Sequence, residues 1–176
     1  MRIIAGSRKG HAIAAPKGLS TRPTSDRTRE AVFNIVAAWV EDAQVLDLFA
    51  GSGAMGLEAL SRGARRAVLV EADGRACRAI DANLAKLRLT GAEVVCRDVG
   101  AFVAAETRSY DLVFCDPPYD EYAAFEPLLA RYAPRLLADG GLLVVETSAR
   151  AAEPELPLER RTSRRYGAAR ITLFAA

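Results

Sequence analysis

The sequence has few of the residues that bind metals or form disulfides. It contains one histidine and three cysteines among 176 residues. Cys77, Cys96 and Cys115 are far apart and form no Cys-x-x-Cys pair, so we expect no metal site. Their odd number and spacing suit a reducing compartment, which predicts a cytoplasmic protein. Cys96 and Cys115 lie in apolar runs and are expected to be buried. The single histidine, His11, lies in a basic segment, which argues against a histidine-based catalytic triad.

Long apolar runs are also missing. No stretch approaches the ~20 residues that cross a bilayer, and the basic N-terminus lacks the apolar segment of a signal peptide. Hydrophobic residues make up 51% of the chain and charged residues 26%, as in ordinary globular proteins. We therefore expect one domain over residues 1–176, with no membrane contact.

Charge is unevenly distributed although the net charge is only +2. Residues 1–30 carry a net charge of +5, residues 150–176 carry +3, and the residues between them carry −6. Basic ends around an acidic centre could bind a polyanion such as RNA. A solvated surface without a partner is the alternative, and composition does not decide between them.

A glycine-rich turn organises the chain. An apolar run with one acid, Asp47, leads into Gly51, Gly53 and Gly56, and a helical pattern follows. This order is typical of a buried parallel strand, a tight turn and a helix packed on the sheet. The glycines allow close approach of backbone to a ligand at the carboxyl end of the strand.

The spacing of the glycines does not identify that ligand. Gly51, Gly53 and Gly56 match G-x-G-x-x-G, and Glu71 follows Gly51 by 20 residues, where an acid can bind a ribose. NAD and S-adenosylmethionine both fit these features. Asp47 favours S-adenosylmethionine, because a carboxylate suits an ammonium group and repels a pyrophosphate.

Strand and helix patterns alternate after residue 44, which predicts an α/β fold of the Rossmann type with helices on both faces of a parallel sheet. The expected strands cover 44–49, 66–71, 92–96, 110–115 and 141–146, and the expected helices cover 54–62, 74–87, 99–106 and 122–137. Residues 158–164 and 169–174 predict an antiparallel hairpin that closes the sheet.

The N-terminal part is expected to differ. Two short apolar runs around Arg8 and Lys9 predict a small β-hairpin with a basic tip. Thr24 or Ser25 would cap a helix whose apolar face extends to Trp39 and Val40. Arg22, Arg27 and Arg29 could bind a phosphate or carboxylate, or could pair with Asp26 and Glu30 on the helix surface.

Acids end successive strands of the predicted sheet. Asp47, Glu71, Asp98 and Asp116 would share one edge, where they would repel one another without separate partners. S-adenosylmethionine offers an ammonium group, a ribose diol and an adenine amine to the first three. Asp116 remains for the substrate.

Asp116 begins the motif Asp116-Pro117-Pro118-Tyr119. The prolines stiffen the loop and remove backbone donors, which leaves acceptors and an aromatic ring. Such a set binds the exocyclic amine of a nucleobase. Asp116 and the Pro117 carbonyl would hold the amine hydrogens, and Tyr119 would stack on a base removed from its helix.

These residues resemble known families. The glycine turn with the Asp-Pro-Pro-Tyr motif resembles class I S-adenosylmethionine-dependent methyltransferases that modify amino groups. Three further segments resemble the bacterial 16S ribosomal RNA guanine-N2 methyltransferase family: Met1-Arg2-Ile3-Ile4-Ala5-Gly6, Arg22-Pro23-Thr24-Ser25-Asp26-Arg27 and Leu46-Asp47-Leu48-Phe49-Ala50-Gly51-Ser52-Gly53. The resemblance covers nearly the whole chain.

The resemblance implies a seven-stranded sheet and methyl transfer to N2 of a guanine in the small ribosomal subunit or its assembly intermediate. Separately, we expect the protein to be a monomer. Residues 1–20 would form a basic extension of a catalytic core at 21–176. The implied cofactor-binding residues are Asp47, Gly51, Gly53, Glu71, Asp98, Arg22 and Thr24. The implied catalytic residues are Asp116, Pro117, Pro118 and Tyr119, and the implied RNA contacts are Arg8, Lys9 and Arg27. Family members often carry an acid after the last Tyr-Gly, where this chain has Ala168 and Ala169.

Other functions fit parts of the sequence. An adenine-N6 methyltransferase acting on DNA or RNA needs the same acceptors, although such enzymes usually carry a separate recognition domain. A NAD-dependent dehydrogenase explains the glycines but not residues 116–119. A non-catalytic RNA-binding module leaves the clustered acids unexplained.

Overall fold

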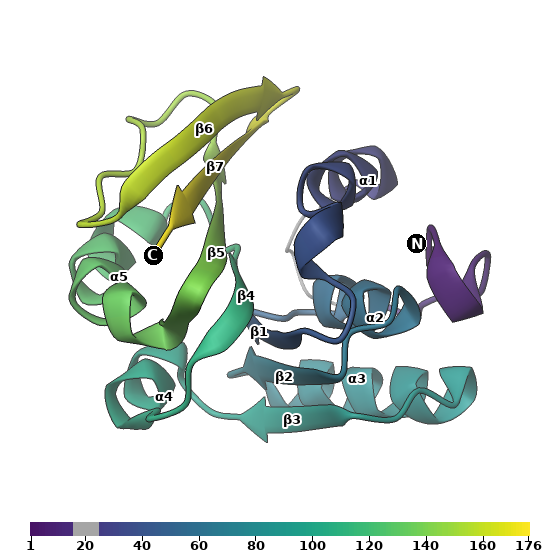
Figure 1. The fold of residues 1–176 in the computed structure, drawn as a ribbon. Coiled ribbons are helices and arrows are strands. Elements are labelled where there is room, and N and C mark those ends of the chain that lie inside the picture. Colours follow the sequence, from purple (N-terminus) through teal and green to yellow (C-terminus); the bar gives the residue numbers. More distant parts are fainter. Residues whose placement is uncertain (16–24) are drawn as a thin grey trace.

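One seven-stranded sheet forms the centre of the computed structural model, which describes residues 1–15 and 25–176 (Figure 1). The strands are β1 (Gln44–Leu48), β2 (Arg66–Glu71), β3 (Ala92–Cys96), β4 (Tyr110–Cys115), β5 (Leu137–Ser148), β6 (Glu159–Tyr166) and β7 (Ala169–Ala175). Their order across the sheet is β3-β2-β1-β4-β5-β7-β6. The first five strands are parallel, and β6 and β7 form an antiparallel hairpin on β5. The predicted α/β fold is therefore confirmed.

The order of the strands reverses at β1. The chain proceeds outward from β1 to β2 and β3, and then returns to place β4 on the other side of β1. Leu48 is thus paired with Val70 of β2 and with Cys115 of β4. Open α/β sheets bind ligands at such a switch point, beyond the carboxyl ends of the strands.

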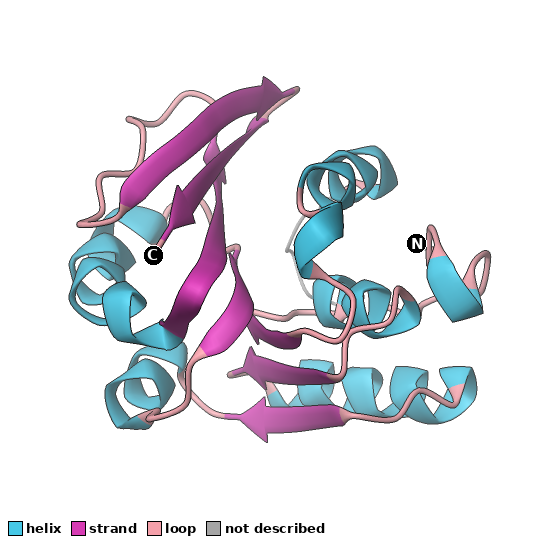
Figure 2. Cartoon of the chain, in the orientation of Figure 1, coloured by secondary structure: helices cyan, strands magenta, loops and turns pink. Residues whose placement is uncertain are grey.

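Helices cover both faces of the sheet (Figure 2). They are α1 (Asp26–Ile35), α2 (Ala54–Ser61), α3 (Gly74–Leu87), α4 (Val99–Ala105) and α5 (Tyr122–Leu136). Buried residues of α1, α2 and α3 share one hydrophobic cluster, and buried residues of α4 and α5 share another. Since alternate side chains of a strand point to opposite faces, the central strands are apolar throughout.

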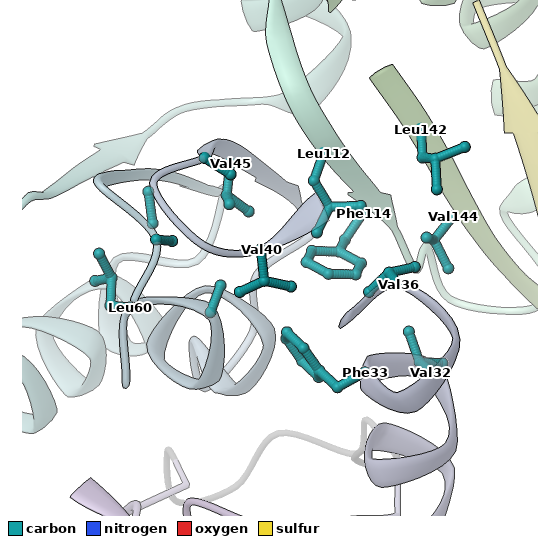
Figure 3. Close-up of a cluster of buried hydrophobic side chains, with 14 of the residues drawn as sticks. Val32, Phe33, Val36, Val40, Val45, Leu60, Leu112, Phe114, Leu142 and Val144 are labelled. Atoms are coloured by element: carbon teal, nitrogen blue, oxygen red, sulfur yellow. The ribbon is translucent and has the colours of Figure 1, made fainter. Parts of the chain in front are cut away.

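The first hydrophobic cluster attaches α1 to the sheet. Phe33 of α1 lies against Phe114 of β4, with ring centroids 5.5 Å apart (Figure 3). Val36 lies near Val144 of β5 in the same view, and Val32 and Leu142 belong to the same cluster. These contacts place the N-terminus of α1 near the strand ends that carry the candidate site.

Most predicted element limits agree with the structure, but the first helix ends earlier than predicted. It stops at Ile35, and a 3-10 helix (Ala37–Trp39) follows. Trp39 is 39% exposed rather than part of a buried helix face, and its indole N–H donates to the Gly140 carbonyl at 3.1 Å. Cys96 is exposed, because β3 is the edge strand and its last residue projects from the sheet, whereas Cys115 is buried as predicted.

The predicted N-terminal hairpin is present in reduced form. An isolated bridge joins Arg2 to Ala12, and a 3-10 helix (Gly6–Arg8) lies at the tip. The backbone N–H groups of Ile4 and Ala5 donate to the buried Glu58 carboxylate of α2, at 2.8 and 2.9 Å. The segment is therefore fastened to a helix rather than to the sheet.

Candidate active site

Glycines shape the turn between β1 and α2. Gly51 and Gly53 have φ angles of +55° and +79°, which only glycine adopts easily. A Cβ at Gly56 would lie 2.7 Å from Cδ2 of Leu69 in β2, so this glycine lets α2 approach the sheet. Within the turn, Gly51 is half-buried and a Cβ there would have no neighbour nearer than 4.0 Å, whereas Gly53 is buried against Ile80 and Leu69.

Asp47 is a buried acid at the start of this turn. Its side chain is 2% exposed, and its Oδ2 accepts a hydrogen bond from the Gly56 N–H at 2.9 Å. Burial raises the pKa of Asp47 from 3.8 to about 7, the Gly56 hydrogen bond opposes this, and the nearby Glu71 adds to it. A cationic group bound beside Asp47 would compensate its charge.

Glu71 connects the end of β2 to the same turn. One carboxylate oxygen accepts from the Gly51 N–H at 2.7 Å, and the other accepts from the Asp73 N–H at 2.8 Å. Each oxygen has two lone pairs, so these bonds leave capacity for hydroxyl donors. The structure therefore brings Asp47, Gly51 and Glu71 together, as the sequence predicts for neighbouring strand ends.

Asp98 lies beyond the end of β3 and caps α4. Its Oδ1 accepts from the Ala101 N–H at 2.8 Å, and its side chain is exposed. Glu71 and Cys96 are paired across β2 and β3, which places Asp98 on the same edge as Glu71. The residue thus has a structural role in the helix cap and an accessible position at the rim.

The Asp-Pro-Pro-Tyr motif follows β4 at this edge. Asp116 is half-buried, Pro117 is buried, and Tyr119 is 42% exposed, which is unusual for a large aromatic side chain. The Tyr119 hydroxyl donates to Oε1 of Glu146 at 3.2 Å. An exposed ring held in place by its hydroxyl is suited to stacking against a planar ligand.

A pocket of about 410 Å³ lies next to this motif. Its walls come from the start of α1, the Tyr119 loop, the end of β5 and the turn between β6 and β7. The lining residues are Ser25, Arg27, Thr28, Tyr119, Glu146, Arg165, Tyr166, Gly167, Ala168 and Ala169. The C-terminal hairpin therefore contributes a wall of the candidate site.

Glu146 was missed by the sequence reasoning. It is 8% exposed and lies near the carboxyl end of β5. The sequence contained a signal for this residue, because Glu146 ends the predicted strand 141–146, just as other acids lie at the ends of the earlier strands. Its closeness to Tyr119 depends on β5 lying beside β4, which the sequence does not specify.

The three residues expected to contact RNA, Arg8, Lys9 and Arg27, lie in different surroundings. The Arg8 guanidinium donates to the Leu87 carbonyl and, at 3.2 Å, to the Arg88 carbonyl, so it caps the end of α3. Lys9 is exposed, and Arg27 lines the pocket. Predicted residues Arg22 and Thr24 lie outside the described residues.

Arg29 forms ion pairs within the protein, with Asp26 and Glu58, instead of lying where it could bind a ligand. Its side chain is fully buried, its Nη2 lies 3.1 Å from Asp26, and its Nε lies 3.7 Å from Glu58. Ser25 caps α1 by accepting from the Thr28 N–H, as one of the two predicted caps.

Over residues 1–15 and 25–176, no cluster of three metal-binding side chains occurs, and no helix is long and apolar enough to span a membrane.

Known proteins are similar to this chain in sequence and in fold. "Ribosomal RNA small subunit methyltransferase D" of Escherichia coli strain K12 is 40% identical over 157 residues, which cover 89% of this chain and 79% of that protein. "Putative rRNA methyltransferase YlbH" of Bacillus subtilis is 38% identical, with 88% and 86% covered. The solved structure of "Putative methyltransferase yhhF" from E. coli has a TM-score of 0.88 at 36% identity, with 99% and 97% covered.

The fold and these similarities define the class of the protein. A sheet with this strand order, a glycine turn after β1 and acids at the next strand ends are the features of a class I methyltransferase, which uses S-adenosylmethionine. Within that class, the chain belongs to the family described as "Conserved hypothetical protein 95", whose model matches residues 1–175.

Proposed function

We propose that this methyltransferase transfers a methyl group to N2 of a guanine in the RNA of the small ribosomal subunit. One observation supports the proposal most strongly. Asp116-Pro117-Pro118-Tyr119 follows β4, and β4 pairs with β1, whose glycine turn lies beside Asp47 and Glu71. The name of the E. coli relative, which is 40% identical, supports the ribosomal substrate.

The residues at the switch point fit S-adenosylmethionine. Asp47 would bind its ammonium group, because a buried carboxylate with a raised pKa gains most from a nearby cation. Gly51 and Gly53 would line the methionine part, Glu71 would bind the ribose and Asp98 the adenine. When bound, the cofactor supplies a methyl group on a sulfonium. Arg22 and Thr24 remain proposed contacts from the resemblance alone.

The Asp-Pro-Pro-Tyr loop would hold the target base. Asp116 and the Pro117 carbonyl would accept the two hydrogens of the exocyclic amine and keep its nitrogen aimed at the reacting carbon. Asp116 can also take the proton that the amine releases. Tyr119 would stack on the base, which must leave its helix to enter the site.

Basic residues near the site would contact the RNA backbone. Lys9 is exposed at the N-terminal tip and Arg27 lines the pocket, so both can reach phosphates. Arg8 would contribute charge while capping α3. We place residues 1–20 as an extension of a single catalytic domain that acts as a monomer on the small subunit or its assembly intermediate, in the cytoplasm.

Methyl transfer to small subunits that lack the modification tests this proposal. With labelled S-adenosylmethionine, we expect label in N2-methylguanosine after digestion to nucleosides. Asp116→Ala should reduce the rate about 100-fold or more, because it removes an acceptor from the reacting amine. Asp139→Ala serves as the control, since Asp139 is exposed in the first part of β5, away from the carboxyl ends.

The nucleoside product distinguishes the alternatives. Label in N6-methyladenosine would retain the fold and cofactor but overturn the guanine assignment. Cofactor binding without label on subunits, naked RNA or DNA would overturn the proposed substrate. Full activity of Asp116→Ala would overturn the role of the motif.

A further inference from the structure

A second carboxylate lies beside the one proposed to hold the amine. Cys115 of β4 is paired with Val145 of β5, so the next residues, Asp116 and Glu146, lie at neighbouring positions on adjacent parallel strands. Glu146 lines the 410 Å³ pocket together with Tyr119. Glu146 therefore lies in the wall of the pocket, and Asp116 follows the neighbouring strand end beside it.

The position of Glu146 is defined by its surroundings. Its side chain is 8% exposed, and its Oε1 accepts the hydrogen bond of the Tyr119 hydroxyl. The ring proposed to stack on the base thus orients this carboxylate through its hydroxyl. Each carboxylate oxygen has two lone pairs, so Glu146 can accept a hydrogen bond from a donor of a ligand as well as the one from Tyr119.

Guanine has such a donor next to its amine. Its N1–H and its N2 amine are adjacent on the Watson–Crick edge, and both donate. Adenine instead has a lone pair at N1, which would face the lone pairs of the carboxylate. Enzymes that act on flipped bases commonly read this edge by hydrogen bonds.

We propose that Glu146 accepts the N1–H of the target guanine and thereby selects guanine over adenine. This inference rests on the proposed function, and adds a specificity residue to it. Asp116 holds the reacting amine, Glu146 reads the neighbouring ring nitrogen, and Tyr119 positions Glu146 while it stacks on the base. Arg27 and Arg165 line other walls of the pocket, where they would face the phosphates on either side of the flipped nucleotide.

The test compares guanine with 2-aminopurine, which keeps the N2 amine but has a lone pair at N1 and no O6. The guanine that the wild-type protein modifies is replaced by 2-aminopurine through splinted ligation of the RNA. Both RNAs are assembled into small subunits. Single-turnover methylation is measured for wild type and for Glu146→Gln, whose amide has nearly the same shape and can donate to N1.

We expect wild type to prefer guanine by about tenfold or more. Glu146→Gln should lose about 10- to 100-fold on guanine, as expected for one hydrogen bond to a charged group. Its rate on 2-aminopurine should change less than about threefold, because the amide N–H can pair with N1. The missing O6 affects both proteins alike, so the change in preference isolates N1.

Two controls separate this role from a structural one. Glu155→Gln changes an exposed carboxylate and should retain the wild-type preference. Tyr119→Phe keeps the ring but removes the hydrogen bond to Glu146, and should reduce the guanine preference by a smaller factor.

The outcomes are distinct. If Glu146→Gln loses the same factor on both bases, or none on guanine, the inference is wrong while the proposed function stands. If wild type methylates neither RNA, the proposed function itself fails. Retained preference in Glu146→Gln with a lower unfolding temperature would assign Glu146 a purely structural role.

Discussion

Asp47 illustrates a conflict at the scale of a single residue. The protein buries its carboxylate beside Glu71 and gives it one backbone hydrogen bond, from Gly56. This arrangement disfavours the charged form in the absence of a cation. The same arrangement prepares the site for the ammonium group of the proposed cofactor, so stability is lower where binding requires it.

A pH dependence follows from the raised pKa of Asp47. Between about pH 4 and about pH 7 the unfolded chain has this group ionised while the folded chain holds its proton, so the free energy of unfolding falls as pH rises through that window. Asp47→Asn removes this fall. Without cofactor, we expect the variant to resist urea better than wild type above pH 7 and equally below pH 4.

Cofactor affinity should rise with pH, whereas the free energy of unfolding falls. Because the proposed contact pairs the ammonium group with ionised Asp47, calorimetry should show tighter S-adenosylmethionine binding to wild type as pH rises from 6 to 8. Asp47→Asn should bind about tenfold or more weakly at pH 8, without this pH trend. If wild type and Asp47→Asn showed the same pH dependence of stability and of cofactor affinity, the role assigned to Asp47 would be contradicted.

The packing of α2 on the sheet acts at the scale of an element. Gly56 lets the helix approach β2, where a Cβ would lie 2.7 Å from Cδ2 and 2.9 Å from Cγ of Leu69. The same helix carries Glu58, which binds the N-terminal segment. A shift of α2 would therefore move both the turn proposed to bind the cofactor and the basic tip of the N-terminal segment.

Two glycine substitutions in helices test this packing. Alanine improves helix propensity by up to about 1 kcal/mol, but at Gly56 the added methyl overlaps Leu69, which costs about 1–3 kcal/mol, so we expect a net loss of up to about 2 kcal/mol in urea unfolding. Gly74→Ala in α3 is the matched control, because its nearest neighbour would be Nη1 of Arg78 at 3.6 Å. Equal stability changes at both positions would refute the argument.

The fold shows what can be read from the sequence at this scale and what cannot. The limits of β2, β3, β4 and α3 agree with prediction, since apolar runs there end at charges and glycines. β5 begins earlier than predicted because Leu137 pairs with Tyr110 across an irregularity in the sheet. Such pairing depends on distant residues, which local pattern does not contain.

The same distinction applies to the site. The strand-end acids were predictable, because parallel strands bring their carboxyl ends to one edge. The buried position of Arg29 was not, because its partner Glu58 is distant in the sequence. Glu146 required knowledge that β4 and β5 are neighbours, and that the β6–β7 turn completes the pocket.

Charge acts at the scale of the whole molecule. Residues 1–30 and 150–176 are basic and the residues between them are acidic, while the sum is only +2. The proposed RNA contacts Lys9 and Arg27 belong to the N-terminal basic part, and Arg165 to the C-terminal one. Pocket residues from both ends lie together, so the two basic parts can act on one RNA.

RNA affinity should therefore depend steeply on salt. Lys9→Gln and Arg27→Gln should each reduce the slope of log affinity against log salt by about 0.7–0.9, the release expected for one phosphate contact. Arg131→Gln on α5, across the sheet from α1, should leave the slope unchanged. Weaker binding with an unaltered slope would show that these side chains do not contact phosphates.

The attachment of the N-terminal segment has a consequence for the order of folding. Ile4 and Ala5 bind Glu58, Arg8 binds the end of α3 at Arg88, and Ala14 exchanges two hydrogen bonds with Asn83. These residues thus have partners that are made some 50 to 80 positions later. They cannot make these contacts until α3 has been synthesised, so the N-terminal segment reaches its final place only after α2 and α3, which follow it in the chain.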